Sequence, residues 1–232
     1  MKIIHVERAA KVEGTVGIPG SKNGSLALLA AACMADEPVT LHGVPDIADI
    51  RLIIRLSEEI GCVIERDPSG GLKVDPRHIH TAELDPVKTS SYRASYYFIG
   101  ALLAKFGRVS IGYPGGDDFV SRPIDQHLKM LRMLGANIVF HQNRFEVSAD
   151  RLKGAVIYFD TVTFGATING MLAAALAEGE TVLLNAARDP EVTDTAILLN
   201  RMGAKITGAG TDTIRIRGVR RLGGCIHTVI PD

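Results

Sequence analysis

The sequence has few cysteines and few aromatic residues. It has no tryptophan, 5% aromatic residues and only three cysteines. Cys33, Cys62 and Cys225 are odd in number, far apart and without a C-x-x-C pair. Neither a disulfide framework nor a structural zinc site is therefore expected, and reduced cytosolic thiols are the default.

An excess of charge and long apolar runs are also missing. Lysine plus arginine equals aspartate plus glutamate, 26 against 26, so the net charge is zero. This argues against a surface that coats nucleic acid and against a polybasic membrane patch. No apolar run approaches the roughly 20 residues that span a bilayer, and the first residues resemble a short strand rather than a signal peptide. We expect a soluble, cytoplasmic protein with neither nucleic acid nor membrane as a partner.

What the chain does contain is an internal repeat. The phrase I-G-C-V-I at residues 60–64 returns as L-G-A-N-I at 134–138 and M-G-A-K-I at 202–206, a period of about 70 residues. An alanine-rich helix, a strand and an amphipathic helix precede each phrase, and a pair of strands follows. This order predicts three α-β-α-β-β units, at about 21–88, 89–153 and 154–230.

The helix patterns predict how the three units pack. The alanine-rich helices are apolar nearly all round, which is typical of burial on every side, whereas the second helix of each unit has a polar face. The sequence therefore predicts an α/β (α+β) fold that inverts the usual barrel. Helices would lie inside it and sheets would face the solvent.

Three loops occupy corresponding positions in the units, at residues 20–23, 90–95 and 161–167. A pseudo-threefold arrangement would place them at one end of the domain. Cations beside helix N-termini suit a ligand with several negative charges. The alternative is that the first helix is merely capped by Ser21 or Asn23, beside an exposed lysine. The side chains expected to converge are Lys22, Arg93 and the hydroxyls of Thr161, Thr163 and Thr167.

The stretch from residue 113 to 128 combines a glycine loop with charged residues. Pro-Gly-Gly can only be a turn or mobile loop, and Asp117 and Asp118 follow it. Such an acid pair can supply or take a proton. Ser121-Arg122-Pro123 resembles a helix start, where Arg122 would suit phosphate or carboxylate. The alternative is an ordinary solvated turn.

Nothing in the sequence indicates a metal or a cofactor. His127 follows the loop, but no second histidine or cysteine stands at ligand spacing. We therefore interpret His127 as a capping or packing residue, and expect no metal and no cofactor.

Several motifs together carry a family resemblance. They are S-K-N-G-S-L-A-L-L-A-A-A, Y-R-A-S, P-G-G-x-x-x-x-S-R-P-I-D-x-H-L, N-A-A-R-D-P-E-V-x-D and M-G-A-K-I-x-G-A-G-T-D-T-I. Over essentially the whole chain, the sequence resembles the UDP-N-acetylglucosamine enolpyruvyltransferase (1-carboxyvinyltransferase) family. The resemblance implies transfer of the enolpyruvyl group from phosphoenolpyruvate to the sugar 3-hydroxyl, the first committed step of peptidoglycan synthesis.

The resemblance also implies roles for individual residues. Phosphoenolpyruvate would be bound by Lys22, Asn23, Arg93 and Arg122. The UDP-sugar would be bound by Arg93, Arg122, Pro123, Ile124, Asp125, Gln126, Thr161, Val162, Thr163 and Phe164.

The chain departs from the family in the loop. Most members carry a cysteine directly after Pro-Gly-Gly as the proton donor that fosfomycin alkylates, and this chain has Asp117 there. A carboxylic acid of raised pKa can transfer the same proton but cannot form the thioether. The resemblance therefore implies fosfomycin resistance. Asp118 is an alternative acid, although the unshifted spacing to Ser121 favours Asp117. Thr161 and Phe164 also differ from the usual residues, which would alter the nucleotide site.

The second departure is length. Family members continue after the position of Asp232 into a second domain of the same architecture, which the residues at 1–20 would join. We therefore expect a half-enzyme, residues 21–232 being one domain, that needs the second domain for turnover. Alternatives are a paralogue for another uridine nucleotide and a non-catalytic nucleotide-sugar-binding domain. The P-G-G loop and the S-R-P-I-D-Q-H stretch disfavour 5-enolpyruvylshikimate-3-phosphate synthase.

Overall fold

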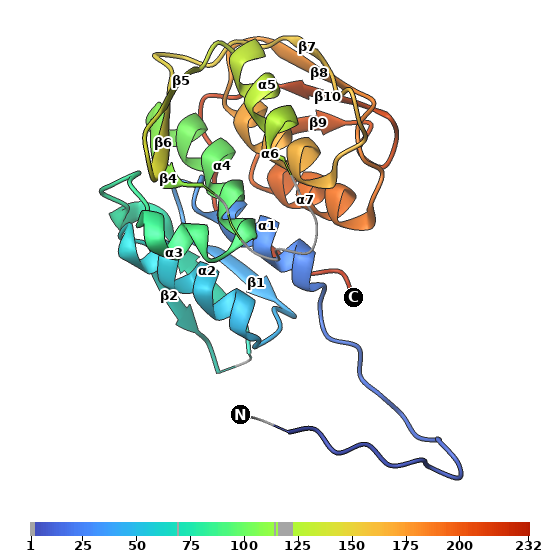
Figure 1. Ribbon diagram of the computed structural model, residues 1–232. Coiled ribbons are helices and arrows are strands. Elements are labelled where there is room, and N and C mark those ends of the chain that lie inside the picture. Colours follow the sequence, from blue (N-terminus) through green and yellow to red (C-terminus); the bar gives the residue numbers. More distant parts are fainter. Residues whose placement is uncertain (1–2, 69, 114, 116–122) are drawn as a thin grey trace.

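The structure is a computed structural model that describes residues 3–68, 70–113, 115 and 123–232. Residues 3–19 run away from the rest of the chain as an exposed segment, within which no strand is assigned (Figure 1). The short strand expected at the first residues is therefore wrong for the described part, since a strand needs a neighbour to pair with. That residues 1–20 join a second domain stays a prediction.

The first unit builds a sheet that the last strand of the chain completes. In the order β11-β1-β3-β2, β11 runs parallel to β1 and the other pairs are antiparallel. The chain therefore returns to its first unit at its C-terminal end, close to where α1 begins. The elements are α1 (Lys22–Ala32), β1 (Val39–His42), α2 (Ala48–Glu59), β2 (Val63–Arg66), β3 (Leu72–Asp75), the short helix η1 (Pro76–His78) and β11 (Ile226–Thr228).

The second unit builds a three-stranded antiparallel sheet, in the order β4-β6-β5. Its register opposes Val109 to Val147 and Ile111 to Phe145, and all four side chains are buried. The alternate residues of both strands thus form one apolar face over the helices. The elements are α3 (Pro86–Ser90), η2 (Arg93–Tyr96), α4 (Tyr97–Phe106), β4 (Arg108–Gly112), α5 (Asp125–Met133), β5 (Asn137–Phe140) and β6 (Arg144–Ser148).

The third unit builds a four-stranded sheet, in the order β7-β8-β10-β9. Its parallel pair, β7 with β8, corresponds to β11 with β1 in the first sheet. The elements are β7 (Val156–Tyr158), α6 (Phe164–Ala175), β8 (Glu180–Leu184), α7 (Pro190–Arg201), β9 (Lys205–Thr207) and β10 (Thr213–Arg217).

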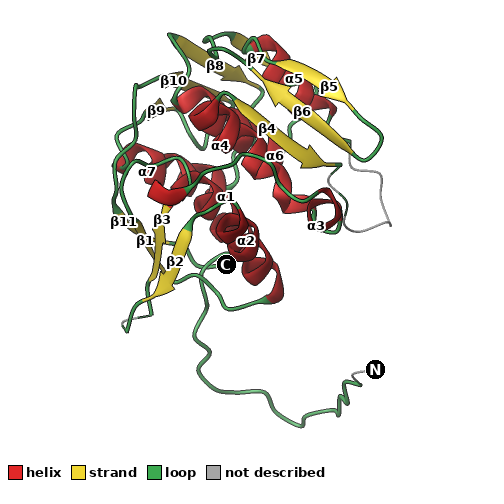
Figure 2. Cartoon of the chain, turned by 90° about the vertical axis from the view of Figure 1, so that its left-hand side faces the viewer, coloured by secondary structure: helices red, strands yellow, loops and turns green. Residues whose placement is uncertain are grey.

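The helices lie between the sheets (Figure 2), as the sequence predicts. Nearly every residue of α1, α4 and α6 is buried, whereas α2, α5 and α7 keep one exposed face each. Small residues let the inner helices approach closely. At Gly100 of α4, a methyl group would overlap Asn169 of α6.

Several expected boundaries are wrong. The helix expected from Ser121 begins at Asp125, and Pro123 and Ile124 precede it. Tyr96, Ile99 and Leu103 follow Arg93 at helical spacing, which would fit one helix, but the structure divides this segment into η2 and α4. Residues 75–89 are polar and include two prolines, which is typical of a connection, yet they contain η1 and α3. Among the helices of the described residues, none is long and apolar enough to cross a membrane.

Candidate active site

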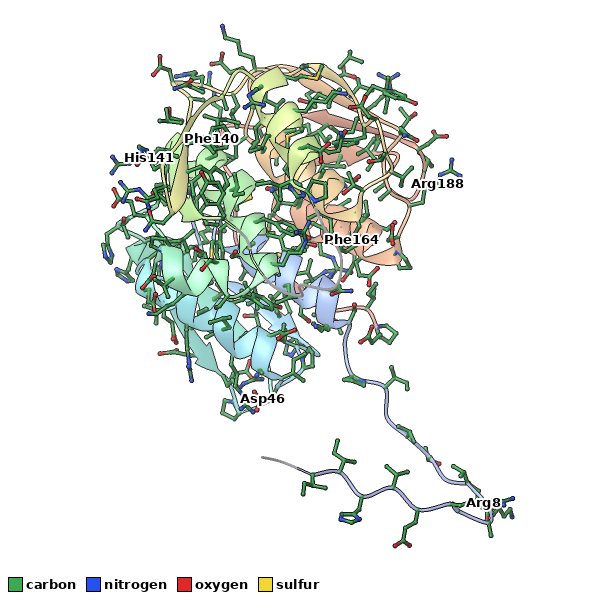
Figure 3. The ribbon with its side chains drawn as sticks, viewed as in Figure 1. Arg8, Asp46, Phe140, His141, Phe164 and Arg188 are labelled. Atoms are coloured by element: carbon green, nitrogen blue, oxygen red, sulfur yellow. The ribbon has the colours of Figure 1, made fainter. Side chains whose placement is uncertain are left out.

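A cavity of about 480 Å³ opens where the inner helices begin. It joins the starts of α1, α4 and α6 with α2, so loops far apart in sequence meet there. Phe164, at the start of α6, lies in this region (Figure 3). Four of the expected site residues, Lys22, Asn23, Arg93 and Phe164, line the cavity. The full lining is Lys22, Asn23, Leu26, Asp49, Tyr92, Arg93, Ala94, Tyr96, Tyr97 and Phe164.

Ser21 holds the start of α1 in place. The Gly24 backbone N–H donates to Ser21 Oγ at 3.2 Å, so Ser21, rather than Asn23, is the cap. Ser21 Oγ in turn donates to Glu191 Oε1 at 3.1 Å. The Ser21 backbone N–H donates to the carbonyl of Ile230 at 2.7 Å. Ser21 is thus held both by α7 and by the segment that contains Ile230. The backbone position of the next residue, Lys22, is fixed as a result.

Lys22 forms an ion pair that the sequence analysis missed. Its Nζ lies 2.5 Å from Oδ2 of Asp49, in the first turn of α2. Asp49 also faces Tyr92, whose pKa is raised first by burial and then by the charge of Asp49. The signal for Asp49 in the sequence was weak, because an acid in the first turn of a helix is ordinarily explained by the helix dipole.

Arg93 and His127 both lie close to the ring of Tyr96. The Arg93 guanidinium carbon is 5.6 Å from the centre of the Tyr96 ring, and the His127 ring is 4.7 Å from the same centre. His127 is buried, and burial, followed by the charge of Arg93, lowers its pKa to about 3. The predicted packing role of His127 is confirmed. A neutral imidazole thus supports the Tyr96 ring on which Arg93 rests.

Asn169 determines which nitrogen of His127 carries the proton. Its Oδ1 accepts from the Gly100 N–H at 2.7 Å, and its Nδ2 donates to the carbonyl of Tyr96 at 2.8 Å. The same amide group lies 3.1 Å from His127 Nδ1 and donates to it. Nδ1 is therefore the acceptor, and the proton is on Nε2. This fully buried network joins α4, α5 and α6 beneath the cavity.

The Gln126 side chain links the two segments that are expected to bind the nucleotide. Gln126 Nε2 donates to Asp160 Oδ2 at 3.1 Å, and Gln126 Oε1 accepts from the Asp160 N–H at 2.9 Å. Lys129 Nζ adds a bond to Asp160 Oδ1 at 2.7 Å, and these two partners lower the pKa of Asp160. The segment 123–126 is thereby placed beside 161–164.

Thr167 does not converge on the cavity, contrary to the prediction. Its hydroxyl donates to the carbonyl of Thr163 at 2.8 Å and accepts from the Ala187 N–H at 3.0 Å, and the residue is fully buried. Its place inside α6, one turn after the helix start, explains the error. Thr161 and Val162 are exposed and Thr163 is half-buried.

The loop expected to carry the acid is described only in part. Asp117, Asp118 and Arg122 lie outside the described residues. Gly115 lies directly against the backbone of Ser90, where any side chain would overlap the Ser90 carbonyl. The start of the loop therefore passes beside the segment that carries Arg93.

A larger depression of about 840 Å³ lies at the other ends of the same inner helices. Several of its charged groups neutralise one another, since Lys105 pairs with Asp36 and Arg151 with Glu178. Aromatic rings and helix starts are instead gathered at the smaller cavity, where Lys22 and Arg93 accompany them. That cavity is the candidate active site.

A family model confirms what the architecture indicates. The model described as "EPSP synthase (3-phosphoshikimate 1-carboxyvinyltransferase)" matches residues 6–232. The chain belongs to this family.

Curated relatives within the family carry the name UDP-N-acetylglucosamine 1-carboxyvinyltransferase 2. The proteins of Geobacillus kaustophilus and Bacillus subtilis are each 47% identical over 232 residues, which is the whole of this chain but 53% and 54% of theirs. That of Lactococcus lactis is 47% identical over 235 residues, and 56% of it is covered. The chain thus spans about half the length of the curated relatives that it matches.

Solved structures agree on the fold. The enolpyruvyl transferase NikO from Streptomyces tendae superposes with a TM-score of 0.81 at 24% identity, covering 95% of this chain and 52% of that one. EPSP synthase from Acinetobacter baumannii gives 0.73 at 20% identity, covering 93% and 49%. This family member therefore has the α/β enolpyruvyl transferase fold.

Proposed function

We propose that the chain is one half of a UDP-N-acetylglucosamine 1-carboxyvinyltransferase of the cytoplasm. It would bind phosphoenolpyruvate and UDP-N-acetylglucosamine, and a second domain would complete the site. The observation that carries the proposal is the cavity into which α1 and η2 bring Lys22, Asn23 and Arg93. An ammonium, a guanidinium and helix N–H groups at one opening suit a ligand with phosphate and carboxylate groups. The names of the 47% identical relatives support the sugar substrate.

Each of these residues would have a distinct role in the reaction. In the reaction a proton adds to the methylene carbon of phosphoenolpyruvate, while the sugar 3-hydroxyl loses its proton and its oxygen bonds to the adjacent carbon. Phosphate then leaves as the new methyl group gives up a proton, which restores the carbon–carbon double bond. Lys22 and Arg93 would stabilise the negative charge of the tetrahedral intermediate and of the departing phosphate. Asp117 is our candidate for the acid that protonates the methylene carbon, and Arg122 for a second phosphate contact. Closure over the ligands would exclude water.

The nucleotide would lie along the segments joined by Gln126 and Asp160. Because the Gln126 amide is used by Asp160, the backbone of residues 123–126, rather than the Gln126 side chain, would contact the uridine. Exposed Thr161 and Val162, half-buried Thr163, and Phe164 at the cavity would complete this surface.

The test is phosphate release from phosphoenolpyruvate and UDP-N-acetylglucosamine, with this chain mixed with a separately produced second domain. We expect release from the mixture, and a loss of about 100-fold in Lys22→Ala, from removing a charge-assisted contact. Lys205→Ala is the control, since that exposed lysine of β9 does not line the cavity. Phosphate release that Lys22→Ala leaves unchanged would contradict the proposal. Substrate binding without release in any mixture would indicate a binding domain only.

The acid can be tested in the same assay. We expect Asp117→Asn to abolish release, and Asp117→Cys to restore a thiol that fosfomycin alkylates. Wild type should be fosfomycin-resistant. Full activity in Asp117→Asn would transfer the role to Asp118, whose own Asn variant is the matched control.

A second candidate is transfer to another uridine nucleotide. It is favoured by Phe164, whose ring occupies the cavity wall at a position where the resemblance implies valine. Titration calorimetry with UDP-N-acetylglucosamine, UDP-glucose and UDP distinguishes the two. Tighter binding of the amino sugar supports the first proposal, whereas equal affinities favour the second.

A further inference from the structure

Lys22 is a flexible side chain at the rim of the cavity, yet it has a defined position. Its side chain is 45% exposed, and ordering a free lysine costs conformational entropy. The described structure gives it one ionic partner, Asp49, at 2.5 Å. A lysine ammonium has three N–H donors. With one donor on Asp49, two are left for a ligand.

Asp49 is less exposed than Asp46, the carboxylate of a neighbouring ion pair. Its side chain is 32% exposed, against 59% for Asp46 in its pair with Arg51. Asp49 and Tyr92 both line the cavity, and Tyr92 is half-buried beside the carboxylate. Asp49 also stands in the first turn of α2, where the helix dipole favours a negative charge. A carboxylate so placed offers Lys22 a fixed point of attachment.

The fixed position of Asp49 affects how Lys22 can bind a ligand. An isolated exposed ion pair contributes little to stability, so stability does not account for the pair's position at the cavity. Pre-organisation does, because a cation already ordered toward a ligand no longer loses that freedom on binding. We propose that Asp49 is a positioning residue, which holds the Lys22 ammonium directed into the cavity for the phosphate-bearing substrate. The identity of that substrate rests on the proposed function, whereas the ordering of Lys22 does not.

Nuclear magnetic resonance tests the ordering on the chain itself. The ¹³C heteronuclear Overhauser effect of the Lys22 ε-methylene reports how rigid the side chain is, and Lys22→Arg assigns its signal. We expect an ordered Lys22 in the wild type and a mobile one in Asp49→Asn, with Asp49→Glu restoring part of the order. The matched control is Asp46→Asn, which removes an equal charge near the same helix but away from Phe164 and the cavity (Figure 3). A Lys22 as rigid in Asp49→Asn as in the wild type would overturn the proposal.

Calorimetry with phosphoenolpyruvate then links order to binding. We expect its affinity to fall about tenfold in Asp49→Asn and to be unchanged in Asp46→Asn, at equal melting temperatures. A gain in affinity in Asp49→Asn would overturn the proposal, because Asp49 would then compete with the ligand for Lys22. If the wild type together with its second domain binds no phosphoenolpyruvate, the proposed function fails. The resonance measurement alone then decides the role of Asp49.

Discussion

His127, the buried histidine beneath the site, allows us to predict how stability changes at acidic pH. His127 is neutral in the folded chain because burial, and secondly the charge of Arg93, hold its pKa at about 3. Asp125, the other charged group that acts on it, favours the protonated form but does not outweigh them. In the unfolded chain the imidazole is solvated and has a pKa of about 6.5. Folding therefore excludes a proton that the unfolded chain accepts.

The direction and size of the pH effect on the free energy of unfolding follow from this difference in the pKa of His127. Above pH 6.5 the ring is neutral in both states, so it adds no pH dependence. Below pH 6.5 only the unfolded state gains the proton, and the free energy of unfolding falls by about 1.4 kcal/mol per pH unit until the folded pKa is reached. Between pH 7.5 and 5.5 the His127 contribution is therefore a loss of about 1.4 kcal/mol, and by pH 4.5 it is nearly twice that.

Urea unfolding followed by circular dichroism at pH 7.5, 6.5, 5.5 and 4.5 measures the effect. His127→Gln keeps an acceptor for Asn169 but removes the titrating ring, so the loss between pH 7.5 and 5.5 should be about 1.4 kcal/mol smaller than in the wild type. His141→Gln removes an exposed ring instead and is the control. Equal losses in the wild type and His127→Gln would refute the reasoning. An equally reduced loss in the control would show that the effect does not belong to His127.

Three further predictions concern packing. Gly100→Ala should destabilise the chain by about 2 kcal/mol in urea, because the methyl group overlaps Asn169 where α4 meets α6; a stability equal to the wild type would contradict that contact. Gly115→Ala should displace the loop from Ser90 and lower phosphate release at least tenfold, with the melting temperature nearly unchanged; full activity would show that this contact has no catalytic consequence. Thr181→Val should raise the stability by about 1 kcal/mol, since the buried Thr181 hydroxyl has no hydrogen-bond partner in the described part of the chain; a loss would indicate a partner.

The glycines of the repeated phrase show why the fold could be anticipated from the sequence. Gly61, Gly135 and Gly203 have φ angles of 106°, 92° and 104°, and each ends the turn between an outer helix and a strand. Such angles favour glycine, so the same local requirement recurs in each unit and is visible in one sequence. The burial of the alanine-rich helices was predictable for a similar reason, because these helices are apolar nearly all round.

The site was only partly predictable, because its contacts join distant segments. Lys22 and Arg93 could be proposed from their positions at helix starts, but no local pattern pairs Lys22 with Asp49. The use of the Thr167 hydroxyl by Ala187 depends on how the loop after β8 packs on α6. The start of α5 at Asp125 likewise differs from the boundary that Pro123 suggested. Periodicity determines which face of a helix is buried, but does not determine its partner.

The polar side chains in and near the expected binding segments fall into two sets, and this division indicates which of them can act on a ligand. Gln126 and Thr167 were expected from the sequence at the binding site, yet their side chains, like that of Lys129, hold the surrounding segments together. A group of this kind cannot meet a ligand without releasing a buried or charged partner, which costs about 1–3 kcal/mol. Lys22 differs, because it lines the cavity and its ion pair with Asp49 leaves two N–H donors for a ligand. Chemistry should therefore depend steeply on Lys22 and only indirectly on the other three.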